Sequence, residues 1–557
     1  MTNYRNIHTK CDSRKLFGEI ITHELKLQAM ENVSKFQIGA ISGHRAQEHL
    51  FTIKSVISLY ISQGKGLILS LYDISKYFDR ENLKDCMGEL YKANVKGKLY
   101  RLIYTLNKDT EVSVKTPVGI TESAAVGEGL GQGTNEGAIV SSINLDGGVK
   151  ESFEDSDKEV LYIDVKVNPC LFQDDIARLA ENIDSVKEGN RRLETMAETK
   201  LLDYNIDKSN SIIIGSRKFR KNIKEKLETN PLMFCGKTMK ISESDIKYLG
   251  DYLSFSLAES VFTTVQKRKG LTMRQISEIR ITIEDIRSNQ LGGILTGIDI
   301  WNLAVVPFLY NNSECCVDIP KKAMNVLNSI QNTFFVSLFG TSKGCPIPIL
   351  YWDTGILTPE NLIIYKKLLF NHHLNQLSDD CLAKEILVIQ KENELPGLAK
   401  ECTEYMSELG IDSDPSDNTK TQWKKICKNR IHEKNRTELL TRISSYKKLD
   451  YSRICEEQYG LHPYLSSMNL SFARTFFASR SHMLRTVQMN FKRKTTFAAN
   501  LYKCTCMEDD YQEHLISCPS YAHLREGLDL EGSDTDLVRY YQRVISDREQ
   551  REERGET

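Results

Sequence analysis

The chain has almost no excess charge of either sign: 74 lysines and arginines balance 75 acidic residues over 557 positions, a formal net charge of −1. This balance excludes a whole-chain basic field, so a nucleic-acid partner would have to be held by local basic surfaces. Cysteines number only 14, far below the density of a disulfide scaffold. Hydrophobic residues make up 40%, which is enough for several cores and excludes a wholly disordered chain.

Long hydrophobic runs are missing too. The most apolar window, Leu291 to Tyr310, contains Asp299 and Pro307 and therefore predicts a buried helix and turn rather than a membrane span. The polar first fifteen residues lack the apolar segment of a secretory signal. We therefore expect an intracellular protein of the nucleus or cytoplasm that is not secreted and has no membrane contact.

The hydrophobic period changes near residue 255. Before it, short apolar runs predict buried strands over Leu67–Tyr72, Val160–Val165 and Ile212–Ile214, separated by helices. After it, only helical spacing remains, interrupted by a linker over 408–419 and ending in a charged segment that we expect to be frayed. The fold class is therefore α+β.

Three carboxylates stand at predicted strand ends. Asp73 follows the run Leu67–Tyr72, and the pair Asp174-Asp175 separates two apolar flanks, as in a hairpin turn. Carboxylates in apolar surroundings need a compensating cation, and clustered oxygens with substrate phosphates suit Mg²⁺. An Asp-Asp pair in a turn is more often simply solvated, so the dipeptide alone does not decide.

The order of short motifs resembles that of reverse transcriptases of the non-LTR retrotransposon type. Leu71 to Asp79 resembles motif A, and Phe172 to Asp175 resembles motif C. The other resemblances are Tyr4–Ile7 and Gln37–Leu50 to fingers motifs, Gly129–Gly133 to motif B, Asn205–Ser209 to motif D, Tyr248–Gly250 to motif E and Val306–Tyr310 to the thumb. Several weak signals in the right order jointly favour this family.

The resemblance implies a right-hand polymerase with the following parts: partial fingers (1–66), a palm with an antiparallel sheet (67–255), a helical thumb (256–345), a helical basic region (346–495), a zinc knuckle (496–525) and a charged tail (526–557). It also implies an RNA-directed DNA polymerase with an RNA template, a DNA primer or target, and dNTPs as partners. The incomplete fingers and the missing nuclease lead us to expect a truncated element copy. The sequence leaves the oligomeric state open.

The resemblance assigns catalytic roles residue by residue. Asp73 and Asp174 would hold two Mg²⁺ ions, with Asp175 as a supporting carboxylate, for nucleotidyl transfer to a primer 3′-hydroxyl. Lys208 would protonate the leaving pyrophosphate, or it is an ordinary solvated lysine. Phe78 would exclude a ribose 2′-hydroxyl, or it is an ordinary core aromatic.

The resemblance also gives substrate-binding positions. Ile74 and Phe78 lie in motif A, and Gln132 with Gly133 would line the minor-groove side of the incoming base pair. Three departures from the family pattern concern the fit of the template and leave the metal ligands in place: Leu71-Tyr72 stands where Phe-x is usual, Thr134 to Gly137 replaces the usual Ser-Pro, and Gln173 stands where alanine is usual.

A second group lies near the end of the chain. Cys504, Cys506, His514 and Cys518 offer four soft ligands with spacing suited to structural Zn²⁺, and they resemble the knuckle that follows the polymerase in the same family. The alternative to a zinc site is that the three thiols and the histidine are unrelated to one another.

Two basic stretches precede that group. The stretch Lys420–Lys448 contains ten lysines and arginines but only two acidic residues. The stretch Ser471–Lys494 contains six basic residues and no acidic one. We expect their cations to contact phosphates and their phenylalanines to lie in the core. Two alternatives to the polymerase remain: a catalytically inactive RNA-binding remnant and a maturase-like protein of the same fold.

Overall fold

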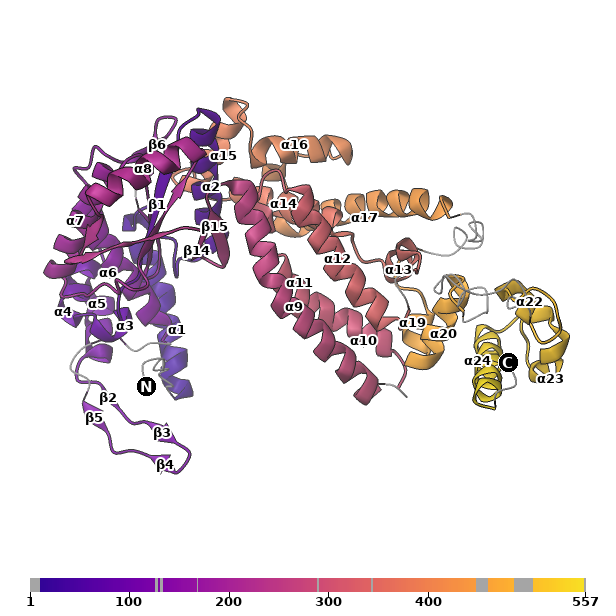
Figure 1. The fold of residues 1–557 in the computed structure, drawn as a ribbon. Helices are drawn as coiled ribbons and strands as arrows, with labels where there is room; N and C mark the ends of the chain where they lie inside the picture. The colour runs from indigo at the N-terminus through magenta and orange to yellow at the C-terminus, as the bar shows by residue number, and fades with distance from the viewer. Residues whose placement is uncertain are drawn as a thin grey trace.

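The computed structural model describes residues 11–125, 129–130, 134–167, 169–287, 290–341, 344–446, 459–484 and 504–554. Every strand within these ranges lies between residues 67 and 254, and the chain after 257 is helical (Figure 1). This division at about residue 255 matches the sequence prediction. We refer below to the strand-bearing part as the sheet region and to residues 257–480 as the helical region.

A five-stranded sheet forms the centre of the sheet region. Its strand order is β13-β10-β1-β9-β8, antiparallel except for the β10–β13 pair. The strands are β1 (Leu67–Tyr72), β8 (Cys170–Phe172), β9 (Asp175–Ala180), β10 (Asn210–Ile214) and β13 (Lys240–Ser242). The predicted strands at 67–72 and 212–214 and the hairpin around Asp174-Asp175 are thus confirmed.

Both faces of this sheet are buried, which explains the continuous apolar runs. Along β1, Leu67 and Leu69 pack into one hydrophobic cluster while Ile68 packs into another, because successive side chains point to opposite faces. The first cluster includes residues of α2 and of the helical region, and the second includes residues of α6 and α7. Strands covered on both sides need no polar alternation.

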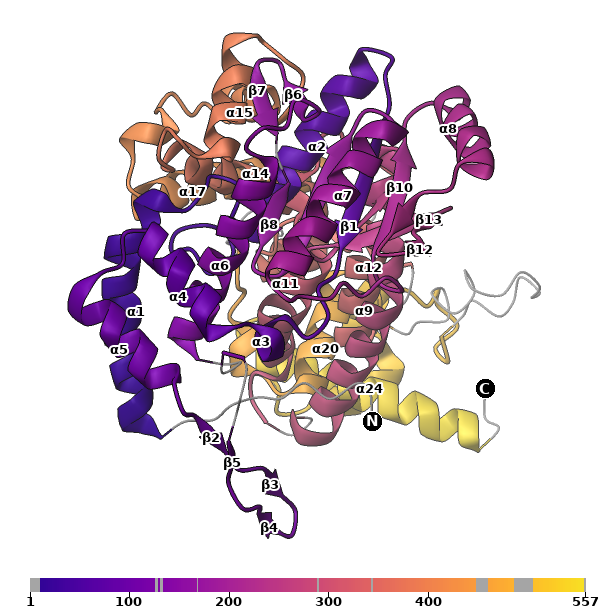
Figure 2. The ribbon, with the colours of Figure 1, turned by 90° about the vertical axis from the view of Figure 1, so that its left-hand side faces the viewer.

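Helices and small hairpins surround the sheet. The helices are α1 (Asp12–Ala29), α2 (Ala46–Ser62), α3 (Tyr77–Arg80), α4 (Leu83–Lys92), α5 (Gly97–Asn107), α6 (Asn135–Phe153), α7 (Ile183–Thr199) and α8 (Arg217–Thr229). The hairpins pair β2 (Glu111–Val112) with β5 (Ala124–Ala125), β3 (Lys115–Thr116) with β4 (Gly119–Ile120), β6 (Val160–Tyr162) with β7 (Val165–Val167), β11 (Met233–Phe234) with β12 (Lys237–Thr238), and β14 (Asp245–Tyr248) with β15 (Asp251–Ser254). The ribbon from β2 to β5 projects away from the body in both views (Figures 1 and 2).

The helical region consists of packed helices without a sheet. They are α9 (Leu257–Arg287), α10 (Gly293–Ile300), a π-helical turn (Trp301–Val305), α11 (Val306–Leu309), α12 (Lys321–Leu338), α13 (Ile347–Thr354), α14 (Pro359–Asn375), α15 (Leu382–Glu392), α16 (Leu398–Glu408), α17 (Lys420–Ser444), α19 (Tyr464–Ser467) and α20 (Leu470–Arg480). The apolar window at 291–310 forms the helical run from α10 through the π-helical turn to α11, with Trp301 fully buried, and ends in a turn at Tyr310; the predicted helix and turn are thus confirmed, although Leu291 and Leu303 are exposed. None of the helices in the described residues is long and apolar enough to cross a membrane.

A small unit at the end of the chain contains α22 (Gln512–Ser517), α23 (Ala522–Arg525) and α24 (Asp534–Glu553). The prediction of a frayed segment over 529–557 is wrong for its described residues, because α24 packs Tyr540, Tyr541 and Val544 against Leu515 and Cys518. The sequence prediction failed here because the segment is highly charged and its apolar residues are spaced along only one face of the helix. A second correction concerns 160–165: Ile163 has φ 59, so the run turns there and forms the hairpin β6–β7 instead of one strand.

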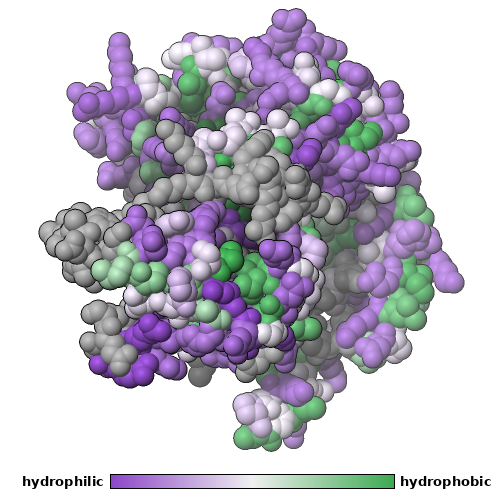
Figure 3. All heavy atoms as spheres, turned by 90° about the vertical axis from the view of Figure 1, so that its right-hand side faces the viewer, coloured by the Kyte–Doolittle hydropathy of each residue, from purple (hydrophilic) through white to green (hydrophobic). Residues whose placement is uncertain are grey.

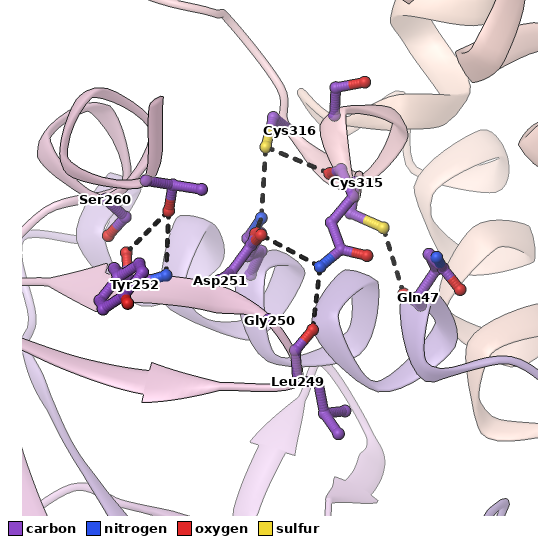
Figure 4. A network of polar contacts seen from close by, with 12 residues as sticks. Gln47, Leu249, Gly250, Asp251, Tyr252, Ser260, Cys315 and Cys316 are labelled. Carbon is purple, nitrogen blue, oxygen red and sulfur yellow. Dashed lines mark hydrogen bonds and ion pairs between the residues drawn. The ribbon is translucent and has the colours of Figure 1, made fainter. Parts of the chain in front are cut away.

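The sheet and helical regions are joined at one buried carboxylate. Asp251 on β15 accepts hydrogen bonds from Lys54 of α2 (2.6 Å), Arg268 of α9 (3.0 Å) and Asn312 (3.0 Å). The Sγ of Cys316 lies 3.2 Å from Nζ of Lys54 in the same network (Figure 4). All these side chains are buried, so this joint fixes α2, β15 and α9 relative to one another.

Candidate active site and candidate metal centre

Asp73 lies directly after β1, at the edge where the loop before β10 crosses the strand end. Its N–H donates to Oγ of Ser209 (3.1 Å), and its carbonyl accepts from the N–H of Asn205 (2.7 Å). The side chain is about one-third exposed, and its Oδ2 lies 3.8 Å from Nζ of Lys208. The segments that resemble motifs A and D are therefore in contact.

Asp174 and Asp175 reach the same edge through strand register. The antiparallel β1–β9 pairing sets Tyr72 opposite Ile176, so one further step along both strands brings Asp73 opposite Asp175. Opposed residues of antiparallel strands have Cα atoms about 4.5–5.5 Å apart. Asp174 occupies the turn between β8 and β9 and is half-buried. The three predicted carboxylates thus come from adjoining ends of two paired strands.

Ile74 and Phe78 lie on the segment after Asp73. The Ile74 side chain is buried in a hydrophobic cluster and its backbone bridges to Tyr204, so it offers no side-chain surface to a nucleotide. Phe78 is half-buried, with its ring centroid 6.0 Å from that of Tyr77.

Gln132 and Gly133 lie outside the described residues, whereas Gly129, Leu130 and Thr134 are described. Gly129 N–H donates to the Glu81 carbonyl and Leu130 N–H to the Phe78 carbonyl, both at 2.9 Å. Thr134 caps α6 by accepting from Gly137 N–H (3.1 Å). A Cβ on Gly129 would meet the Phe78 carbonyl oxygen at 2.8 Å, which explains why glycine stands there. Gly129 and Leu130, the described part of the segment that resembles motif B, are therefore hydrogen-bonded to residues in and just after motif A.

The four predicted soft ligands converge. The Sγ atoms of Cys504, Cys506 and Cys518 and a ring nitrogen of His514 all lie within 4.8 Å of one another. Sγ of Cys518 is 3.5 Å from that of Cys504 and 3.6 Å from that of Cys506, and Cys506 Sγ is 3.1 Å from Nε2 of His514. Four ligands at tetrahedral Zn²⁺ bonds of about 2.0–2.3 Å would be separated by roughly 3.3–3.8 Å. The donor set and its spacing fit one Zn²⁺.

Electrostatics of this cluster favours a thiolate. Burial raises the pKa of the Cys504 thiol, but hydrogen bonds from the Cys506 backbone and from His514 outweigh burial and lower it to about 6. Burial and the neighbouring thiols raise the pKa of Cys518 to about 11. A Cys504 thiolate beside three further soft ligands is an arrangement that a soft cation would stabilise.

A second group of possible ligands was not foreseen from the sequence. His44, Glu48 and Cys381 offer atoms within 4.8 Å of one another, and His373 also contacts Glu48. The Glu48 oxygens lie 2.6 Å from Nδ1 of His44 and 2.7 Å from Nε2 of His373. These distances are shorter than the roughly 3.3 Å that separates two ligands of one tetrahedral ion. We therefore interpret the group as a hydrogen-bonded clasp between α2 and α14.

Protonation of the clasp follows from its contacts. Hydrogen bonds with Cys381 and Glu48 raise the pKa of His44 to about 10. Burial raises the pKa of Glu48, but hydrogen bonds to His373 and His44 outweigh it and keep the pKa below its usual range. No local sequence signal could have revealed this group, because Glu48 and His373 are 325 residues apart.

The predicted basic surface is found on α17. Lys420, Lys424, Lys425, Lys428, Arg430, Arg436 and Arg442 are exposed on this helix, while Trp423, Cys427 and Ile431 are buried beneath it. The expectation that phenylalanines of the second basic stretch lie in the core is confirmed for Phe476 and Phe477, and Phe491 lies outside the described residues. The face of the molecule at the α22–α24 end is mostly hydrophilic, with apolar side chains in small separate groups (Figure 3).

No family model and no curated protein matches this chain. Among solved structures, it aligns with telomerase from Candida albicans in complex with a TWJ fragment of telomeric RNA at 11% identity and a TM-score of 0.36, over 60% of this chain and 56% of that one. It also aligns with telomerase from Candida tropicalis in complex with such a fragment at 12% identity and a TM-score of 0.32, over 68% and 57% of the two chains. This chain thus spans little more than half the length of these proteins.

Proposed function

We propose that this protein is an RNA-directed DNA polymerase resembling the reverse transcriptases of non-LTR retrotransposons. One observation carries the proposal: Asp73 and the Asp174-Asp175 turn lie at adjoining ends of two paired antiparallel strands, with Lys208 3.8 Å from Asp73. The segments that resemble motifs A, C and D, which lie between residues 71 and 209 of the chain, meet at one edge of the sheet, as the resemblance predicts.

In this proposal Asp73 and Asp174 would hold two Mg²⁺ ions, and Asp175 would support them. Bound Mg²⁺ activates the attacking oxygen and stabilises the leaving oxygen of an in-line displacement. The chain's own part is to orient: Ser209 and Asn205 fix the backbone of Asp73, and the β8–β9 turn presents Asp174. Lys208, whose exposed ammonium lies beside Asp73, would protonate the departing pyrophosphate.

Substrate discrimination is assigned to Phe78, five residues after Asp73, whose ring would exclude a ribose 2′-hydroxyl. Gln132 and Gly133 would contact the incoming base pair. The exposed cations of α17 would bind the backbone of the RNA template or DNA target. Cys504, Cys506, His514 and Cys518 would hold a structural Zn²⁺. Such an enzyme would work in the nucleus or cytoplasm, where RNA and target DNA occur.

A primer-extension assay tests the proposal. The full-length protein should extend a DNA primer on an RNA template with Mg²⁺ and dNTPs, and Asp174→Asn should abolish extension while template binding remains. Asp164→Asn is the matched control, since Asp164 is an exposed acidic residue in the comparable turn of the β6–β7 hairpin. A wild-type protein that binds RNA without extending a primer would instead support an inactive RNA-binding protein.

A further inference from the structure

The segment that resembles an early fingers motif lies directly against the turn that carries Asp174. Residues 36–38 run beside β8: Leu171 N–H donates to the Phe36 carbonyl (2.8 Å), and Ile38 N–H donates to the Leu171 carbonyl (3.1 Å). This segment extends the main sheet at its β8 edge. Gln37 sits in the middle of it and is 2% exposed.

Two of the four hydrogen bonds of the Gln37 side-chain amide go to the turn. Its Oε1 accepts from the N–H of Gln173 (3.1 Å), and its Nε2 donates to the Gln173 carbonyl (3.2 Å). The same Oε1 accepts from Gly39 N–H (2.8 Å), and Nε2 also reaches the Ser142 carbonyl of α6 (3.4 Å). Gln37 therefore satisfies both backbone groups of the residue just before Asp174.

Gln173 needs the support of these hydrogen bonds because of its backbone conformation. Gln173 has φ 58, a left-handed conformation that favours glycine, and it is the first residue of a two-residue hairpin turn, where glycine is common. Holding a non-glycine residue there is unfavourable unless surrounding contacts compensate. Close contact comes from Gly39 as well: a Cβ on Gly39 would lie 2.0 Å from the Gln173 nitrogen. Gln37 and Gly39 thus enclose the turn from one side.

We propose that Gln37 is a positioning residue that holds the Gln173–Asp174 turn and thereby sets where the Asp174 carboxylate lies. The catalytic consequence rests on the proposed function, because it assumes that Asp174 is a metal ligand. The hydrogen-bonded turn itself does not depend on that assumption. Partners that orient metal ligands contribute about 10–100-fold to metal affinity or activity, so the effect should be measurable.

Three full-length variants test the proposal. Gln37→Met keeps the length and approximate volume of the side chain and removes all its hydrogen bonds. The same change combined with Gln173→Gly adds a residue that adopts positive φ without support. Gln331→Met is the matched control: Gln331 is fully buried in α12, accepts from the Tyr310 hydroxyl (2.7 Å) and donates to the Leu357 carbonyl (2.9 Å), all in the helical region.

Two measurements are made on each variant: amide hydrogen exchange over 170–177, and steady-state primer extension with titrated Mg²⁺. Gln37→Met should exchange faster in this hairpin, lose about 10–100-fold in kcat and need more Mg²⁺ for half-maximal rate, with KM for the primer–template unchanged. Gln173→Gly in the Gln37→Met background should restore part of the hairpin's protection. Gln331→Met should leave kcat, the Mg²⁺ midpoint and hairpin exchange unchanged.

The outcomes separate the two proposals. Unchanged exchange or unchanged kcat in an active Gln37→Met protein would overturn the positioning role, as would an equal loss of kcat in Gln331→Met. If the wild-type protein extends no primer, the proposed function fails, and hairpin exchange in Gln37→Met still decides whether Gln37 holds the turn. If Gln37→Met does not fold, Gln37→Glu replaces it with the same readouts and criteria, because Glu keeps the acceptor oxygen and the side-chain length.

Discussion

The Asp251 joint makes a sharp prediction about stability. In Asp251→Asn the side chain keeps its shape but loses its charge, while Lys54 and Arg268 stay buried, each with a side chain 8% exposed. Burial opposes the charge on Lys54, but Asp251 at 2.6 Å raises its pKa well above the usual value, so the lysine is charged in the native protein. The variant therefore leaves two buried cations without their shared carboxylate.

The size of the effect follows from this geometry. Removing one partner of a buried ion pair costs about 3–5 kcal/mol in free energy of unfolding. For a cooperative unit of 150–250 residues, each kcal/mol lowers Tm by about 2–4 °C, so the transition should fall by roughly 6–20 °C. Lys54→Met should cost less, because Asp251 then keeps Arg268 and Asn312 as partners.

Thermal unfolding followed by circular dichroism or calorimetry provides the assay. Asp379→Asn is the control, since Asp379 pairs with Lys384 at 2.8 Å on the surface and its side chain is 97% exposed. That variant should leave the transition unchanged. An Asp251→Asn protein as stable as the control, or more stable than Lys54→Met, would refute the view that this carboxylate holds the two regions together.

Three further predictions concern the candidate sites. The Phe78→Ala variant should incorporate ribonucleotides in primer extension. An unchanged preference for dNTPs would show that Phe78 is only a core aromatic. Cys518→Ser should reduce bound Zn²⁺, measured by elemental analysis, from one ion per chain to none, whereas the buried Cys427→Ser should retain it. Because the folded pKa of His44 is raised to about 10, its ion pair with Glu48 contributes stability that is fully present below pH 6.5 and is lost as the pH rises towards 10. The Tm difference between wild type and His44→Gln should shrink over that range, and a difference independent of pH would contradict this.

Much of the sheet region could be predicted from the sequence because its signals are local. The apolar runs of β1 and β10 and the position of Asp73 at a strand end need only neighbouring residues to be recognised. The soft-ligand cluster was equally accessible, since its four members lie within fifteen residues. The hairpin at 160–167 was not predicted, because its turn has a positive φ at Ile163. Glycine or asparagine usually occupies such a position, so isoleucine gave no sign of a turn.

The interactions that the sequence could not reveal are all distant along the chain. Gln37 and Gln173 are 136 residues apart, and the clasp between Glu48 and His373 spans 325. Helix α24 was not predicted for another reason. Most of its residues are charged, and the few apolar residues on one face become recognisable as a core face only when the neighbouring hydrophobic cluster is known. Motif order supplied the one long-range constraint available, and it concerned the segments that resemble the polymerase motifs, among them those with the carboxylates and Lys208.

Helix α2 has a consequence for how the chain is made. The hydrogen-bond partners of three residues in α2 are translated long after the helix itself. Lys54 binds Asp251 and Glu48 binds His373, and Ser55 binds Gln390, which lies 335 residues further along the chain. At the usual elongation rate of about 5–20 residues per second, the side of α2 that packs on α15 would stay uncovered for roughly 15–70 s on the ribosome. The nascent chain should therefore depend on chaperones that bind exposed helices, and slower synthesis at low temperature should not by itself improve the yield of folded protein.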